Sequence, residues 1–83
     1  MNIYVSNLSF TVDTEQLKKL FSPYGIVSSV NIILDRLTNR SKGFAFVRMA
    51  DSNAAEKAMR ELNGAMLDGR LVRLMEAKKN NKF

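Results

Sequence analysis

Cysteine and histidine are both missing from this 83-residue chain. Without cysteine there is no disulfide, no thiolate nucleophile and no thiolate ligand for zinc. Without histidine the chain lacks the side chain most used for proton transfer near neutral pH. The carboxylates do not cluster either, so we expect no enzyme activity and no cofactor or metal. A small disulfide-free chain fits a reducing compartment, and we expect a cytoplasmic location.

Long apolar runs are also missing. No stretch approaches membrane-spanning length, and Met1 leads directly into a strand-like segment, so we expect neither a targeting segment nor a membrane partner. The length allows one compact domain, and the hydrophobic share of 46% is typical of a chain with a true core. A formal net charge of +5 favours polyanionic partners, although charge alone is a weak signal.

Hydrophobic periodicity predicts six elements in the order β-α-β-β-α-β. Asp13 is a good N-cap for the first helix, with Gln16 completing a capping box, and Asp51 or Ser52 caps the second. Alternating apolar and polar residues predict strands over Asn2–Leu8, Val27–Leu34, Gly43–Met49 and Leu71–Glu76. This order describes an α+β, ferredoxin-like sandwich, in which both helices cover one face of a four-stranded antiparallel sheet. The domain spans residues 1–77, and residues 78–83 form a short basic tail.

The third strand carries the functional signal. If Ala45, Val47 and Met49 face the helices, alternation places Lys42, Phe44, Phe46 and Arg48 on the helix-free face. On the first strand, burial of Ile3 and Val5 likewise sends Tyr4 to the helix-free face. These strands are central neighbours in this topology, so three aromatic rings should cluster among cations. Nucleobases stack on such rings, and cations meet phosphates.

Two segments identify a family. Lys42–Met49 resembles the longer signature of RNA-recognition motif (RRM) domains, Lys/Arg-Gly-aromatic-Gly/Ala-Phe-Val-x-aromatic, and Ile3–Leu8 resembles its shorter companion. The resemblance extends from Asn2 to about Ala77. It departs from the family at Met49, where the signature has an aromatic residue, and at Ser6, where many relatives have glycine. Alternation turns Met49 toward the core, so we expect the departure at Met49 to change packing and not the binding face. We expect the serine at position 6 to alter the helix-free face slightly.

The resemblance implies a role for each position. Tyr4 and Phe46 would each stack on a base, Phe44 would pack against sugar rings, and Lys42 would pair with a phosphate. Sheet-surface residues would tune which bases fit, while the loop after the second strand and the basic tail would hold the RNA backbone. The expected RNA-binding residues are Tyr4, Asn31, Ile33, Arg36, Arg40, Lys42, Phe44, Phe46, Arg48, Arg73, Met75, Lys78 and Lys79.

The same residues allow other interpretations. An aromatic strand is usually core, but a dry core would not admit Lys42 and Arg48 on the same face as Phe44 and Phe46. The leading hypothesis is a monomeric domain that binds single-stranded RNA in post-transcriptional regulation or as an RNA chaperone. A protein-interaction or dimerisation module, and a general binder of single-stranded DNA or RNA, are the alternatives. The chain resembles the small single-RRM proteins of bacteria, including cyanobacteria, while a domain of a larger eukaryotic protein is a second possibility.

Overall fold

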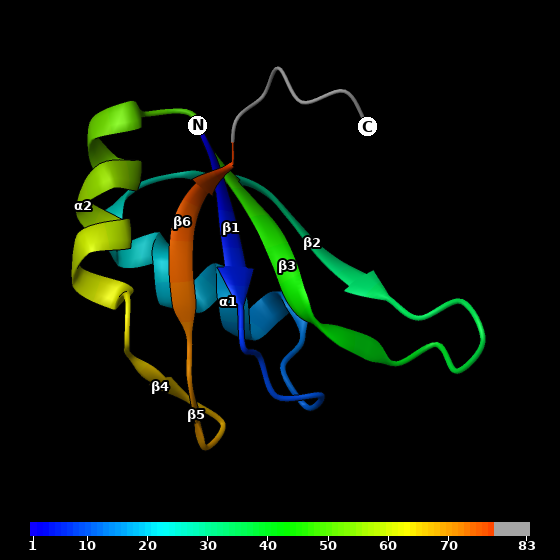
Figure 1. Ribbon diagram of the computed structural model, residues 1–83. Helices are drawn as coiled ribbons and strands as arrows, with labels where there is room; N and C mark the ends of the chain where they lie inside the picture. The colour runs from blue at the N-terminus through cyan, green and yellow to red at the C-terminus, as the bar shows by residue number, and fades with distance from the viewer. Residues whose placement is uncertain (78–83) are drawn as a thin grey trace.

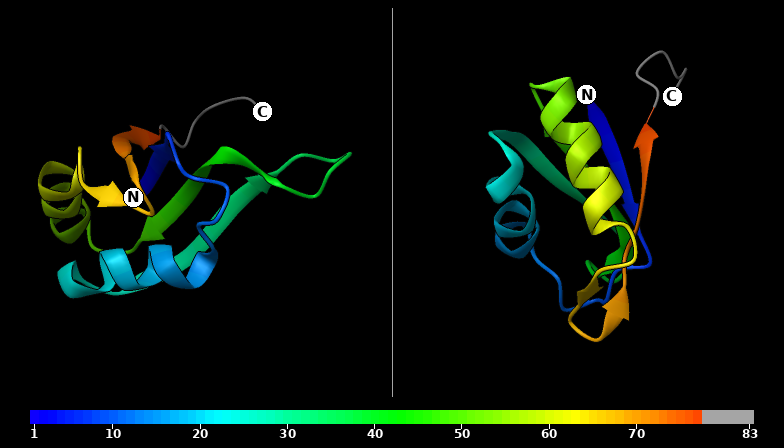
Figure 2. Two further views of the ribbon diagram at one scale, coloured as in Figure 1. Left: turned by 90° about the horizontal axis from the view of Figure 1, so that it is seen from below. Right: turned by 90° about the vertical axis from the view of Figure 1, so that its left-hand side faces the viewer.

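The computed structural model describes residues 1–77, and for Ser41 and Lys42 it describes the backbone only. Four strands form an antiparallel sheet in the order β2-β3-β1-β6, and α1 and α2 both cover one of its faces (Figures 1 and 2). The predicted ferredoxin-like sandwich is confirmed. The elements are β1 (Asn2–Ser6), α1 (Thr14–Phe21), η1 (Ser22–Tyr24), β2 (Val27–Leu34), β3 (Ser41–Met49), α2 (Ser52–Leu62), β4 (Met66–Leu67), β5 (Arg70–Leu71) and β6 (Arg73–Ala77).

Both helices begin at the caps that the sequence predicts. The Asp13 carboxylate accepts a hydrogen bond from the Gln16 backbone N–H at 2.9 Å, and the Gln16 side chain accepts one from the Asp13 N–H at 3.0 Å. This reciprocal pair satisfies two backbone donors that have no partner inside the helix. Asp51 caps α2 through the N–H groups of Asn53 and Ala54.

The core lies between the sheet and the helices. Its side chains come from the inward positions of the strands and from one face of each helix, as the periodicity predicts. The buried apolar residues are Ile3, Val5, Leu8, Val12, Leu17, Phe21, Ala45, Val47, Met49, Ala55, Ala58, Leu62 and Val72. The opposite face of the sheet, which no helix covers, is called the open face below (Figure 1).

Two strand predictions need correction. The first strand ends at Ser6 and not at Leu8, because Asn7 has a left-handed φ of 61° that breaks the extended conformation. The last strand is not continuous from Leu71. Val72 donates its N–H to Ala65 and accepts from Gly64, so β5 pairs with β4 in a small hairpin and the sheet strand starts at Arg73.

Candidate nucleic-acid interface

The two central strands set the open face. In the β1–β3 register, Tyr4 lies opposite Phe46 and Ser6 lies opposite Phe44. Opposite residues of an antiparallel pair project to the same side. Their chain neighbours Val5 and Ala45 are fully buried on the helix side. For the described side chains of these strands, the predicted alternation is therefore confirmed, including the burial of Met49.

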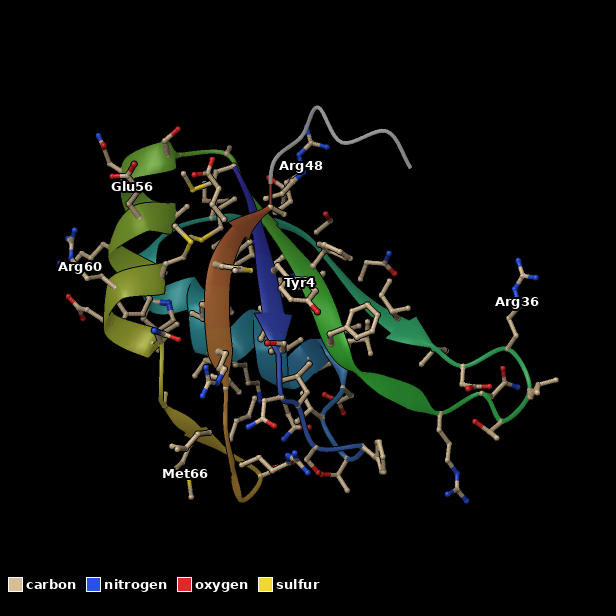
Figure 3. All side chains as sticks on the ribbon, in the orientation of Figure 1. Tyr4, Arg36, Arg48, Glu56, Arg60 and Met66 are labelled. Atoms are coloured by element: carbon tan, nitrogen blue, oxygen red, sulfur yellow. The ribbon has the colours of Figure 1, made fainter. Side chains whose placement is uncertain are left out.

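Tyr4, Phe44 and Phe46 form one aromatic cluster. The Tyr4 ring centroid lies 5.7 Å from that of Phe44 and 5.4 Å from that of Phe46, and the two phenylalanine rings meet edge to face at 6.5 Å. All three side chains are half-buried, because each ring covers part of its neighbours and leaves the rest to solvent. Figure 3 shows Tyr4 projecting from the middle of the sheet toward the viewer.

Cross-strand rows extend the cluster to both sheet edges. Asn31 on β2 lies opposite Phe46, and Met75 on β6 lies opposite Tyr4 with 59% of its surface exposed. One row therefore runs from Asn31 to Met75 through two aromatic rings. Arg73 joins a second row, opposite Ser6.

The remaining predicted residues lie away from the rows of this cluster or outside the part of the chain that the structure describes. Ile33 falls in the register shift between Ile32 and Leu34, and so outside the regular rows. Arg36 is exposed on the β2–β3 loop and points away from the sheet (Figure 3). The Lys42 side chain, Lys78 and Lys79 lie outside the described part of the structure.

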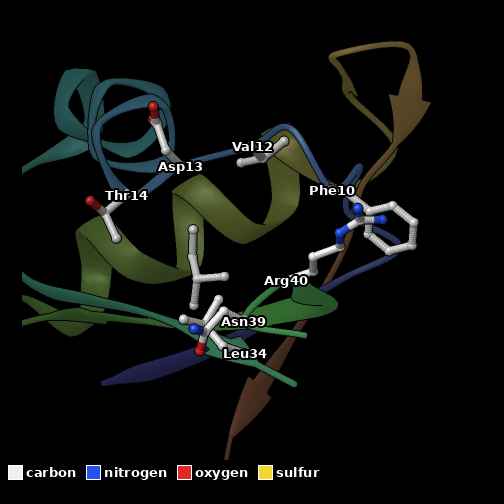
Figure 4. Close-up of a pocket in the computed structure, with 8 residues that line it drawn as sticks. Phe10, Val12, Asp13, Thr14, Leu34, Asn39 and Arg40 are labelled. Atoms are coloured by element: carbon white, nitrogen blue, oxygen red, sulfur yellow. The ribbon is translucent and has the colours of Figure 1, made fainter. Parts of the chain in front are cut away.

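Arg40 belongs to the loop that is predicted to hold the RNA backbone, and its side chain lies beside the start of α1. It lines a groove of about 460 Å³ there, together with three apolar residues, two polar loop residues and the first residue of α1: Phe10, Val12, Leu34, Asp13, Asn39 and Thr14 (Figure 4). The buried side of β2 contributes Ile32 to the same groove. The Arg40 side chain is thus turned toward the helix side of the sheet and not toward the aromatic cluster.

Sequence reasoning missed three residues at one end of the open face. A pocket of about 380 Å³ is lined by Asn7, Phe10 and Arg70 together with Tyr4, Phe44 and neighbouring residues of β1 and β3. Arg70 comes from the β4–β5 hairpin, which the sequence did not predict. The Asp68-Gly69 turn was the available signal, since a tight turn brings the next residue back toward the sheet.

Comparison with known proteins agrees with this geometry. The sequence profile of the RNA recognition motif family matches residues 3–73. The chain belongs to this family.

Relatives of this RRM domain occur in cyanobacteria and plants. The protein RbpE of Nostoc sp. is 44% identical over 78 residues, which are 94% of this chain and 79% of that protein. The chloroplastic 29 kDa ribonucleoprotein of Arabidopsis thaliana is 48% identical over 90% of this chain. This chain spans only 22% of the length of that ribonucleoprotein.

Solved structures show the same fold. The crystal structure of RNA binding protein PG1 is 44% identical to this chain, with a TM-score of 0.92, and the match covers 99% of each chain. A Sex-lethal protein–RNA complex is 36% identical, with a TM-score of 0.86, over 92% of this chain and 47% of that one. The RRM fold is therefore shared with a protein named as RNA-binding and with a protein solved in complex with RNA.

Two ionisable groups of the RRM domain have shifted pKa values, Asp68 and Tyr24. Asp68 accepts hydrogen bonds from the Gln16 amide and the Thr11 hydroxyl, which lower the pKa of its carboxyl below the ordinary value. Desolvation, together with a hydrogen bond to Glu61, raises the pKa of the Tyr24 hydroxyl. Within residues 1–77 no three acidic side chains gather to hold a metal ion, and no helix is long and apolar enough to cross a membrane.

Proposed function

We propose that this RRM domain binds single-stranded RNA by stacking bases on the aromatic cluster of its open face. The observation that carries the proposal is the meeting of three aromatic rings, with centroids 5.4–6.5 Å apart, on the face that no helix covers. The rings pack partly on one another, but together they leave an apolar surface exposed to water, which is typical of a binding site. Unpaired bases offer each ring an apolar partner of matching shape.

Roles follow from the rows of the sheet. Tyr4 and Phe46 stack one base each, and Phe44 packs against the sugar between them. Asn31 and Met75 stand at the two ends of the same row, where they contact the outer edges of the stacked bases. Because an amide donates and accepts hydrogen bonds whereas a thioether is only a weak acceptor, these two positions favour different base edges.

Cations on the open face hold the phosphates. Arg48 and Arg73 are exposed on β3 and β6, and the third cation is assigned to Lys42 from its place in the family signature. Each stacked base is worth roughly 1–3 kcal/mol, and association consumes much of that gain. We therefore expect a micromolar dissociation constant, or about −8 kcal/mol, for a short oligonucleotide. Binding of this strength suits post-transcriptional regulation or RNA chaperoning, where complexes must also dissociate.

The test is the substitution Phe46→Ala. Loss of the ring should weaken RNA binding about tenfold or more, because one stacking partner is removed. Ile26→Ala is the matched control, since it removes an apolar side chain that is 82% exposed in the turn before β2, outside the aromatic cluster. Affinity is measured by fluorescence anisotropy, and circular dichroism shows whether each variant folds. Normal binding by a folded Phe46→Ala variant would refute the proposal.

Single-stranded DNA is the alternative ligand, since stacking alone does not distinguish the two sugars. The same titration with DNA of matching sequence separates the cases. Weaker DNA binding indicates contacts with the 2′-hydroxyl, whereas equal affinity reduces the proposal to general single-strand binding.

A further inference from the structure

A second aromatic surface lies beside the cluster, at the end of the sheet where β1 leaves it. Phe10, in the loop between β1 and α1, keeps 70% of its side-chain surface exposed. It borders the pocket of about 380 Å³ whose other walls include Phe44 and Arg70. This volume lies in the range of small-ligand sites, about 300–1,000 Å³, and the walls join apolar rings to a cation.

Arg70 borders this pocket and is oriented by a hydrogen bond to Asn7. Its Nη2 donates to the Asn7 Oδ1 at 2.7 Å, and the Asn7 Nδ2 donates to the backbone carbonyl of Leu71. Asn7 can turn its side chain this way because its backbone is left-handed, a conformation that asparagine tolerates. The amide thus ties the end of β1 to the β4–β5 hairpin and orients the guanidinium.

The β4–β5 hairpin also forms hydrogen bonds with the β1–α1 loop and with α1. Asp68, in the turn between β4 and β5, accepts from the Thr11 hydroxyl at 2.8 Å and from the Gln16 amide at 3.0 Å. The Asp68 carboxylate is therefore engaged with the α1 side. In the described residues no carboxylate forms an ion pair with Arg70, which leaves the guanidinium with N–H donors for a ligand.

We propose that this pocket binds one further nucleotide of the RNA, with its base against Phe10 and Phe44 and its phosphate on Arg70. The inference rests on the proposed function, because the pocket adjoins Tyr4 and Phe44 and so continues the path of a strand that crosses the cluster. A guanidinium held by one hydrogen bond keeps the fork geometry that pairs with phosphate oxygens. Asn7 acts as a positioning residue, because its Oδ1 accepts the hydrogen bond that orients the Arg70 guanidinium.

The experiment measures affinity as the RNA lengthens. Degenerate oligoribonucleotides of roughly three to eight nucleotides are titrated against the whole chain and its variants. The wild type should gain affinity when the RNA becomes long enough to reach the pocket. Phe10→Ala and Arg70→Gln should each lower the affinity for the longer RNA about tenfold and change the affinity for the shortest RNA little. Arg70→Gln should also lower the magnitude of the salt slope by about 0.7, the share of one phosphate contact on a single strand.

Controls separate binding from folding. Arg60→Gln removes an equal charge from the outer surface of α2 (Figure 3) and should leave the affinity for short and for long RNA unchanged. Arg70→Lys keeps the charge and should restore the salt slope but not the full affinity, because it lacks the fork that Asn7 orients. Thermal melting shows that a loss of affinity is not a loss of fold.

The outcomes are distinct. Equal losses on short and long RNA, or none on either, would overturn the additional subsite. A loss of affinity in Arg70→Gln with an unchanged salt slope would overturn the phosphate contact. If Phe46→Ala binds every length normally, the proposed function fails instead, whatever Phe10 and Arg70 do.

Discussion

Helix α2 packs closely against the turn before β2 because residue 25 has no side chain. A Cβ placed on Gly25 would lie 2.9 Å from the Cβ of Ala54 and 3.4 Å from the Cε of Met49. The backbone of Gly25 is extended, with a φ of 161°, so its conformation would suit any residue. The requirement for glycine is therefore steric, and it comes from a contact between distant segments.

Gly25→Ala should destabilise the domain by about 1–3 kcal/mol, the usual cost of overpacking a core, because a helix backbone must move to admit the methyl group. Urea unfolding measures the loss. The double variant Gly25→Ala/Ala54→Gly is the control: it restores the space and should recover part of the stability despite glycine's low helix propensity. Purely additive effects of the two substitutions would show that the clash is not the cause.

Met49 shows what alternation can establish for a single residue. The family signature has an aromatic residue at this position, and this chain has methionine. Alternation places the side chain in the core, and the structure confirms that it is fully buried, with its Cε beside Gly25. A flexible thioether fills the space left under a close turn, which a rigid ring would fit less readily.

At the scale of elements, the β4–β5 hairpin depends on the Asp68 carboxylate. Hydrogen bonds from Gln16 and Thr11 lower its folded pKa below 3.8. A lowered carboxyl pKa stabilises the fold fully above the unfolded value, and this contribution disappears as pH falls through the folded value. The relevant window therefore lies below about pH 4.

Asp68→Asn should be less stable than the wild type near neutral pH, and the difference should shrink as pH falls through this window. Urea unfolding at a series of pH values measures it. Thr11→Val removes one of the two donors, so it should shift the pH dependence in the same direction by a smaller amount. A difference between wild type and Asp68→Asn that stays constant from neutral pH to pH 3 would contradict the assignment.

The elements differ in how well the sequence predicts them. Both helix caps and the facing of β1 and β3 follow from local patterns, because capping and alternation act over a few residues. The central place of these two strands follows from the order of the elements along the chain. Local patterns do not predict the β4–β5 hairpin, because its strands have only two residues each and Val72 pairs through backbone atoms alone. Because the hairpin is not predicted, Arg70 is missed as well: its contact with Asn7 joins residues that are 63 positions apart.

At the scale of the molecule, positive charge is distributed over both sides. Arg48 and Arg73 are exposed on strands of the open face, whereas Lys57 and Arg60 are exposed on α2. The net charge of +5 would attract RNA to any part of the surface at long range. Only cations that contact phosphates in the complex release counterions, so the salt dependence of binding distinguishes the two groups.

With about three phosphate contacts on a single strand, the slope of log affinity against log salt concentration should be near −2. Arg48→Gln and Arg73→Gln should each reduce its magnitude by about 0.7, and Lys42→Gln should do the same while weakening all RNA sequences alike. Lys57→Gln/Arg60→Gln removes charge from α2 and should leave the slope unchanged. Titrations over a series of salt concentrations measure all of these variants. If the α2 variant flattens the slope as much as the open-face variants, then the RNA is held by overall charge and not by this face. Phe46→Ala changes affinity without changing charge. Comparing it with the charge variants therefore separates the contribution of the aromatic cluster from that of the phosphate contacts.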